Sequence, residues 1–370
     1  MIYRDLGKTG LRVSQLGFGC MRFPMLEGGK EVDLDKTLPI LERAYAGGVN
    51  YYDTAVFYCE GKSEAAVGEF IKDKRDKVIV STKNAHYGDE AEWRRLLEQS
   101  LTRLQTDYID LYNYHAINWD HFSKQVQPRL YKMMQQAKDE GLIRHICLSF
   151  HDTPDALVRI IEAGCPEVIT IQYNLLDQGL SDAITLAHER GIGVVGMGPV
   201  GGGRLGTNVE VFQSILPDIR RVPELALRFV LSNPGVTLAL SGMSTMEQVE
   251  ENLAIAATDR PFTSEELAMV NEHIERLQKM SDLYCSGCGY CMPCPQGVDI
   301  PFTFQKYNEG RVYGFWKDSW GHYKFHAVDG KRSVEQCTQC GVCEPKCPQK
   351  IAIPQELVRA DKALRDHAGE

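Results

Sequence analysis

Eight cysteines in the last quarter of the sequence have a spacing that could hold metal clusters. They form two blocks, which are Cys285, Cys288, Cys291 and Cys294, and then Cys337, Cys340, Cys343 and Cys347. In each block two residues separate the first cysteine from the second and the second from the third, and the fourth cysteine is followed by proline. This spacing is typical of two [4Fe–4S] clusters, in which each block lends its last cysteine to the other cluster. We therefore expect two [4Fe–4S] clusters, which carry single electrons.

Zinc sites and disulfides are the alternative uses of these cysteines. A zinc site takes two C-x2-C pairs per metal from separated positions, whereas here each block packs four cysteines into a short run. Disulfides fit less well, because the sequence begins Met1-Ile2-Tyr3-Arg4 without an apolar signal segment. It also lacks a run of apolar residues long enough to span a membrane. These features predict a protein of the reducing cytoplasm.

The sequence before the cysteines alternates short apolar runs with segments of helical period. The runs are residues 16–21, 49–54, 78–83, 109–115, 143–150, 168–174, 193–197 and 236–241. Helix start signals between them lie at Ser63, Asp89, Thr153 and Thr245. Eight such units over about 250 residues predict a (β/α)8 TIM barrel. A doubly wound sheet is the alternative, but no Gly-x-Gly-x-x-Gly follows the first run.

Two domains are expected from this organisation. Residues 1–280 would form the barrel, with a connecting helix as the last part, and residues 281–370 would form a small iron–sulfur domain. Nine aromatic residues lie between the two cysteine blocks, within residues 302–325. We expect them to pack around the clusters and against the larger domain, because a small cluster-binding unit has little core of its own. A surface for a docking partner is the alternative.

Four polar residues fall where predicted strands end, which is where TIM barrels carry their chemistry. Asp53 closes the second run and Tyr58 follows in its loop, while Lys83 closes the third run and His115 the fourth. A carboxylate, a phenol, an ammonium and an imidazole at one rim make a proton-transfer site. The lysine would lower the pKa of the phenol, the aspartate would hold the lysine, and the histidine would orient a carbonyl oxygen.

Three motifs and the first residues of the chain are similar to those of a known protein family. Residues 50–58 (NYYDTAVFY), 81–83 (STK) and 111–115 (LYNYH), together with the opening at 3–19, resemble the aldo-keto reductase superfamily from residue 1 to about 260. With the cysteine blocks added, the chain resembles the subgroup fused to a ferredoxin-type 4Fe–4S domain. The resemblance implies an N-terminal hairpin that plugs the barrel bottom. It also implies a catalytic tetrad of Asp53, Tyr58, Lys83 and His115, with Tyr58 as proton donor to a carbonyl and a nicotinamide as hydride donor.

The resemblance also implies a dinucleotide site. The loop 196–205 would cover the pyrophosphate, and its glycines allow close backbone approach while its arginine offers a phosphate partner. The stretch 241–252 matches the family's dinucleotide-phosphate motif. The cofactor-binding residues implied in this way are Ser149, Gln172, Asn174, Gly198, Gly201, Arg204, Gly242, Gln248, Glu251 and Asn252.

Two departures from the family pattern bear on the cofactor. Gly242 and Gln248 stand where NADPH-specific members carry basic residues, and no Lys or Arg lies between residues 229 and 259. A 2′-phosphate would lack its usual charge partners, so NADH is expected no less than NADPH. At the family's Ser-Asn position the chain has Ser149-Phe150-His151, which weakens the expected contact with the carboxamide.

Three functions follow as hypotheses, because hydride transfer moves two electrons and a [4Fe–4S] cluster passes one. The first is NAD(P)H-linked reduction of a small-molecule carbonyl, or the reverse alcohol oxidation, with clusters that are structural or exchange electrons with a partner such as a ferredoxin. The second is a reductase that takes electrons from the clusters through a flavin or a radical substrate. The third is a sensing or regulatory subunit, which would have no need of all four tetrad residues.

The charge distribution limits the kinds of partner that the protein can bind. The formal net charge is −9, and residues 285–370 hold 11 Lys and Arg against 10 Asp and Glu. The barrel portion therefore holds 30 basic against 40 acidic residues. An acidic surface repels nucleic acid and anionic membranes. We expect neither as a partner.

Overall fold

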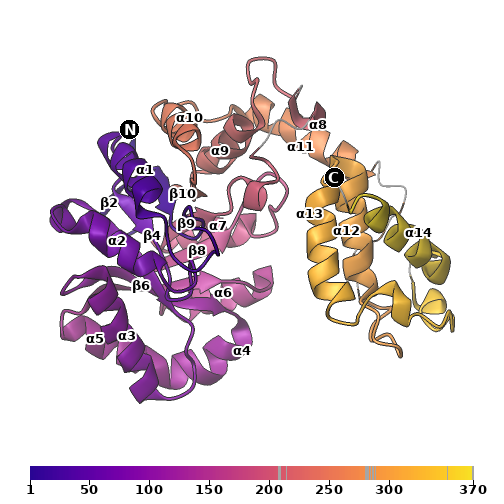
Figure 1. Cartoon of the computed structure of the whole chain (residues 1–370), viewed down its shortest axis with the longest axis horizontal. Helices are drawn as coiled ribbons and strands as arrows, with labels where there is room; N and C mark the ends of the chain where they lie inside the picture. Colours follow the sequence, from indigo (N-terminus) through magenta and orange to yellow (C-terminus); the bar gives the residue numbers. More distant parts are fainter. Residues whose placement is uncertain are drawn as a thin grey trace. The chain divides into compact units, whose positions relative to one another are not determined.

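The computed structural model of the chain describes residues 1–206, 210–213, 215–279, 283, 285, 287, 289–347 and 349–368. It divides into two compact units. The first unit, hereafter the barrel unit, comprises Met1–Gly206 and Pro223–Phe262. The second, hereafter the cysteine unit, comprises Thr207–Val222 and Thr263–Glu370, and its helices α12 to α14 are drawn in orange to yellow (Figure 1).

The barrel unit contains a closed barrel of eight parallel strands. In chain order they are β3 (Leu16–Gly19), β4 (Tyr51–Asp53), β5 (Ile79–Asn84), β6 (Ile109–Ile117), β7 (Ile143–Phe150), β8 (Val168–Gln172), β9 (Gly193–Met197) and β10 (Leu238–Gly242). The strands pair in this order and β10 closes onto β3. Each falls within or overlaps one of the predicted apolar runs. The predicted (β/α)8 fold is therefore confirmed.

An antiparallel hairpin of β1 (Tyr3–Asp5) and β2 (Arg12–Ser14) precedes the barrel. Leu6, directly after β1, and Val13 on β2 are fully buried and pack with Tyr51, Ile79 and Leu111 in one apolar cluster. The last three lie on β4, β5 and β6. The hairpin thus contributes to the core inside the barrel.

Helices between the strands complete the barrel unit. They are α1 (Leu34–Ala46), α2 (Ser63–Ile71), α3 (Glu90–Leu104), α4 (Trp119–His121), α5 (Tyr131–Asp139), α6 (Pro154–Glu162), α7 (Ser181–Glu189), α9 (Val222–Ser232) and α10 (Met246–Ala256). Asp89, Thr153 and Thr245 cap α3, α6 and α10 by accepting a backbone N–H three residues later, as predicted. Ser63 is instead the first residue of α2, and its hydroxyl donates to the Cys20 carbonyl at 2.7 Å. A tertiary hydrogen bond thus takes the place of the expected local cap.

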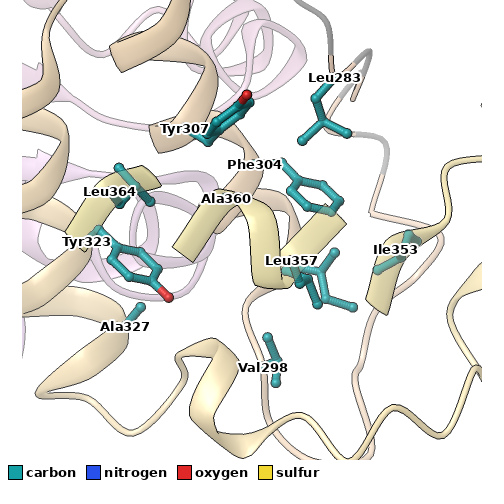
Figure 2. Close-up of a cluster of buried hydrophobic side chains, with 11 residues drawn as sticks. Leu283, Val298, Phe304, Tyr307, Tyr323, Ala327, Ile353, Leu357, Ala360 and Leu364 are labelled. Atoms are coloured by element: carbon teal, nitrogen blue, oxygen red, sulfur yellow. The ribbon is translucent and has the colours of Figure 1, made fainter. Parts of the chain in front are cut away.

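The cysteine unit is built from helices around one apolar core. Its helices are α8 (Glu210–Gln213), α11 (Ser264–Lys279), α12 (Ile300–Tyr313), α13 (Trp316–Tyr323) and α14 (Ile353–Asp366). Figure 2 shows side chains of α12, α13 and α14 converging on this core, among them Phe304, Tyr307 and Tyr323. Several expected aromatic residues are therefore buried here, whereas Phe325 is 79% exposed. No helix in the described part of the chain is long and apolar enough to cross a bilayer.

The division into units differs from the expected boundary after residue 280. Both α11 and the segment of residues 210–222 belong to the cysteine unit. Phe212 is 2% exposed, and its ring stacks on Tyr313 and Phe315 with centroid distances of 5.8 and 6.3 Å. The Val211 carbonyl lies 2.6 Å from Nε2 of His273 on α11. Segments far apart in the sequence thus contact each other within one unit, which a boundary read along the chain cannot show.

Candidate active site and cysteine-lined hollows

The four predicted tetrad residues lie together at the carboxyl ends of β4, β5 and β6. The Lys83 ammonium donates to Oδ1 of Asp53 and, at 2.7 Å, to the Thr54 carbonyl. Its nitrogen lies 4.8 Å from the centroid of the Tyr58 ring. The Tyr58 ring meets the His115 ring edge to face, with centroids 5.8 Å apart. Asp53 and Lys83 are buried, so each charge is compensated by its partner rather than by water.

A left-handed turn brings Tyr58 to this position. Cys59, Glu60 and Gly61 have φ angles of +52°, +55° and +76°. Two of these are not glycine, so the turn carries backbone strain that the surrounding contacts must hold in place. The Tyr58 carbonyl accepts the backbone N–H groups of Gly61 and Ser63, both at 3.1 Å. The turn is thereby fixed immediately after the phenol.

A β-bulge sets the direction of His115. The register between β6 and β7 shifts between Tyr114 and Ile117, and Ala116 has a φ of +56°. Bulges of this kind re-aim a side chain next to a functional site. The Tyr87 hydroxyl also donates to the His115 carbonyl, so the bulge is held from the loop after β5.

The protonation states at the site follow from burial and from Lys83. Burial raises the pKa of Tyr58, and the Lys83 charge lowers it only in part. Lys83 thus lowers the Tyr58 pKa as expected, but the net shift is upward, because desolvation of a phenolate outweighs the attraction of the ammonium. Burial disfavours the Lys83 cation, but Asp53 and Tyr58 outweigh that effect and raise the Lys83 pKa. Tyr58 is thus a protonated phenol beside a cation.

His115 is neutral. Burial, then the charge of Lys83, and then His151 lower its pKa from 6.5 to about 3. A neutral imidazole can donate one hydrogen bond to a carbonyl oxygen without carrying a positive charge. This agrees with the orienting role expected of it.

We predict that the His115 ring stays neutral between about pH 8 and pH 5, where an ordinary histidine takes up a proton. The same shift lowers stability as the pH falls below 6.5, because only the unfolded state then gains the proton. Nitrogen-15 NMR of histidine-labelled protein checks this, with His115→Asn assigning the signal. A His115 signal that titrates between about pH 8 and pH 5 would contradict the prediction.

The residues expected at the nicotinamide lie at or just after the carboxyl ends of β7 and β8. Asn174 donates from Nδ2 to the Gly198 carbonyl at 3.0 Å. Gly198 has a φ of +64°, and a Cβ added there would lie 2.6 Å from Oε1 of Gln172, so only glycine fits. Ser149 is buried near the end of β7, and its hydroxyl has no hydrogen-bond partner among the described residues. Gln172, Asn174 and Gly198 thus form one contact group.

An arginine that the sequence pattern did not indicate, Arg22, reaches the glycine-rich loop after β9. Gly201, Gly202 and Gly203 have φ angles of +60°, +73° and +111°, and Nε of Arg204 donates to the Gly201 carbonyl at 2.9 Å. A Cβ added at Gly202 would lie 3.7 Å from Nη2 of Arg22. Arg22 comes from the loop after β3, so its guanidinium reaches this loop from another part of the chain.

The loop after β10 is held by its own side chains. Oε1 of Gln248 accepts the Ser244 N–H at 2.7 Å, and Asn252 donates to the Ser241 hydroxyl at 3.0 Å. The Ser244 hydroxyl donates to the Arg22 carbonyl at 2.6 Å, which ties this loop to the loop after β3. Gly242 ends β10, and Glu251 is partly exposed on α10. Gln248 and Asn252 therefore shape the loop.

Two hollows in the cysteine unit are lined by thiols. The first, of about 340 Å³ with its open mouth included, is lined by Cys285, Cys291 and Cys347. The second, of about 320 Å³, is lined by Cys294, Cys337, Cys340 and Cys343. Cys288 lies outside the described residues. Each hollow combines one block with the last cysteine of the other block, which is the arrangement that two crossed clusters require.

The thiols around each hollow suit an iron–sulfur cluster, because such clusters are held by cysteine thiolates. Ile300 lines both hollows, so they share a wall. The donor set fits two iron–sulfur clusters.

A closed (β/α)8 barrel with a Lys–Asp–Tyr–His site, together with a thiol-lined unit, defines the class of barrel oxidoreductases that carry an iron–sulfur domain. Residues 15–275 match the model of the Aldo/keto reductase family, and residues 284–352 match that of the 4Fe-4S dicluster domain. The chain therefore belongs to the aldo-keto reductase family and has a C-terminal 4Fe–4S domain.

Known relatives agree with this membership. The uncharacterized oxidoreductase YqkF of Bacillus subtilis (strain 168) is 29% identical over 310 residues, which are 74% of this chain and 96% of that protein. The holo form of aldo-keto reductase AKR11C1 from Bacillus halodurans is 30% identical with a TM-score of 0.64, covering 74% of this chain and 96% of that one. An aldo/keto reductase from Klebsiella pneumoniae in complex with NADP and acetate is 26% identical with a TM-score of 0.61, covering 72% and 93%.

Proposed function

We propose that the barrel reduces the carbonyl group of a small molecule with NADH or NADPH, or catalyses the reverse oxidation of the alcohol. The observation that carries this proposal is the joint placement of a protonated Tyr58, a buried Lys83–Asp53 pair and a neutral His115. These groups form a proton donor beside a cation and a neutral hydrogen-bond donor. Such a set suits a carbonyl oxygen on which negative charge develops.

The chemistry follows from these residues. A nicotinamide, when bound, would supply the hydride that the carbonyl carbon needs. The neutral His115 ring orients the carbonyl oxygen, and Tyr58 gives it the proton, so that an alcohol forms. Lys83 stabilises the phenolate left on Tyr58 until solvent returns a proton. The reverse reaction uses Tyr58 as the base.

Several residues suit a dinucleotide. Gln172, Asn174 and Ser149 would hold the carboxamide end, and the glycine-rich loop would lie along the pyrophosphate. Arg22 adds a cation beside that loop, and its guanidinium has no hydrogen-bond partner among the described residues. It would pair with a phosphate. The solved relative from Klebsiella pneumoniae binds NADP, so both NADH and NADPH remain candidates for this chain.

The thiol-lined hollows would hold two [4Fe–4S] clusters. Cys285, Cys288, Cys291 and Cys347 would ligate one, and Cys294, Cys337, Cys340 and Cys343 the other. The clusters supply one-electron transfer when bound. A ferredoxin or another single-electron carrier would be the partner of this unit, because a nicotinamide moves two electrons at once.

One anaerobic experiment tests the barrel and the clusters together. The purified protein is assayed for iron, sulfide and flavin, titrated with NADH or NADPH by fluorescence, and then mixed with a panel of aldehydes and ketones. We expect dinucleotide binding, consumption of the dinucleotide on addition of a carbonyl, and an unchanged cluster absorbance. Failure of both dinucleotides to bind would contradict the proposed reaction. Bleaching of the clusters by NADH in a flavin-containing preparation would instead support the flavin-coupled alternative.

A further inference from the structure

We propose that Ser81 and Asn113 are positioning residues for this reaction. They hold the Asp53 carboxylate so that its other oxygen faces Lys83, and they thereby set how strongly Lys83 acts on Tyr58. The proposal rests on the function proposed above, because it concerns the same proton donor. Neither residue belongs to the predicted tetrad.

A chain of buried hydrogen bonds carries the proposal. The Ser81 hydroxyl donates to Oδ2 of Asp53 at 2.7 Å, while Oδ1 accepts from Lys83. A hydroxyl has one hydrogen, so Ser81 has only acceptor capacity left. Nδ2 of Asn113 donates to that oxygen at 3.0 Å. The order Asn113, Ser81, Asp53, Lys83 is therefore fixed by donor and acceptor chemistry.

The orientation of Asn113 is also determined. Its Nδ2 lies 3.1 Å from the Thr82 carbonyl, which can only accept, so the amide cannot be turned around. Asp53 pairs with Ser81 across β4 and β5, and Lys83 pairs with Asn113 across β5 and β6. Three neighbouring strands thus supply one rigid frame.

The chain of polar groups is buried, and burying polar groups costs free energy. Ser81 and Asn113 are 0% and 1% exposed. Two residues earlier on the same strands, Ile79 and Leu111 belong to the apolar core inside the barrel. Polar side chains therefore replace apolar ones at the positions on β5 and β6 that lie beside Asp53 and Lys83. Burying a hydroxyl and an amide costs free energy that hydrogen bonds offset; the Ser81 hydroxyl and Nδ2 of Asn113 make such bonds, whereas Oδ1 of Asn113 has no partner among the described residues.

The other titratable groups that face the Asp53–Lys83 pair are neutral near pH 7. Burial raises the pKa of Cys20, from the end of β3, and that of Tyr51 on β4. Burial and the Lys83 charge lower the pKa of His115 on β6 and of His151 after β7. Asp53 and Lys83 therefore supply the charge that Tyr58 experiences.

Removal of the Ser81 hydroxyl should alter this charge. Without its donor, the carboxylate becomes more basic and shares the Lys83 proton more fully. Lys83 then lowers the Tyr58 pKa less, and the phenol becomes a weaker acid. For Ser81→Ala we expect kcat to fall roughly ten- to hundredfold, as for a lost hydrogen bond to a charged group. We also expect the alkaline limb of the kcat–pH profile to move to higher pH, with an unchanged dinucleotide Kd.

The experiment compares four variants with the full-length protein loaded with its clusters. Ser81→Thr keeps the hydroxyl, so its kcat and the alkaline limb of its kcat–pH profile should be close to those of the wild type. Asn113→Leu should change both quantities in the same direction as Ser81→Ala, but less. Ser100→Ala is the matched control, because Ser100 is an equally buried serine on α3 and should change neither. Thermal melting is recorded for each variant.

Unchanged kcat and an unchanged alkaline limb in Ser81→Ala would overturn the proposal, as would an equal loss in Ser100→Ala. If Ser81→Ala does not fold, Asn113→Leu decides by the same two readouts. If the wild-type protein reduces no carbonyl, the proposed function fails separately. In that case the pKa of Tyr58 is measured by ultraviolet titration, and Tyr58→Phe identifies the Tyr58 signal. An unshifted Tyr58 pKa in Asn113→Leu or Ser81→Ala would refute the positioning role of Ser81.

Discussion

Replacing Tyr58 with phenylalanine is expected to reduce kcat for carbonyl reduction by about 10²-fold or more, because general acid catalysis typically contributes that much. Tyr58 is the acid suited to this role. The neutral His115, whose pKa is about 3, would form a poorly stabilised anion if it gave up its remaining proton. Lys83 is engaged with Asp53 and the Thr54 carbonyl. The substitution removes one oxygen, so the turn and the barrel should keep their structure.

The measurement is steady-state kinetics with the best carbonyl substrate, together with dinucleotide affinity and iron content. Only kcat should change. Tyr3→Phe is the control, because it removes a phenol whose hydroxyl donates to the Gly48 carbonyl near the N-terminal hairpin. Wild-type turnover in a folded Tyr58→Phe variant would show that the proton comes from another group.

Replacing Cys347 with alanine is expected to disturb one cluster and leave the other intact. Cys347 belongs to the second block in sequence but lines the hollow that contains Cys285 and Cys291. The affected cluster should therefore be the one held by the first block. Cys294→Ala should have the opposite effect, because Cys294 lines the hollow of the second block. Each variant should lose up to roughly half of the bound iron.

Electron paramagnetic resonance of the reduced protein, with iron and sulfide analysis, distinguishes the two clusters. Cys165→Ala provides a control, because Cys165 is a buried cysteine of the barrel unit and should not affect iron content. If Cys347→Ala and Cys337→Ala abolished the same signal, the crossed ligation would be excluded. A normal iron content in all variants would exclude these cysteines as ligands altogether.

The chain passes between the two units three times, after Gly206, Val222 and Phe262. The glycine-rich loop that would cover the dinucleotide is thus followed closely by the segment that contributes Phe212 to the cysteine unit. A truncation after residue 280 would remove Tyr313 and Phe315 and leave that ring without its partners. The cysteine unit therefore includes a segment that precedes the last barrel strand in the sequence.

Much of the architecture could be predicted from the sequence because it depends on local patterns. Each barrel strand is a short apolar run, and a helix start needs only a capping residue and its neighbour three positions later, as at Asp89 and Thr153. The ends of parallel strands meet at one rim, so Asp53, Lys83 and His115 could be grouped without coordinates. Cysteine spacing is equally local, and it indicated clusters before any hollow was seen.

The tertiary structure decided the features that depend on distance in space or on burial. Arg22 and the glycine-rich loop are about 180 residues apart in the sequence, so no local pattern relates them. The hydrogen bonds from Asn113 through Ser81 to Asp53 cross three strands. Whether the Tyr58 pKa rises or falls depends on the balance between desolvation and the Lys83 charge, and that balance exists only when the barrel closes around both groups.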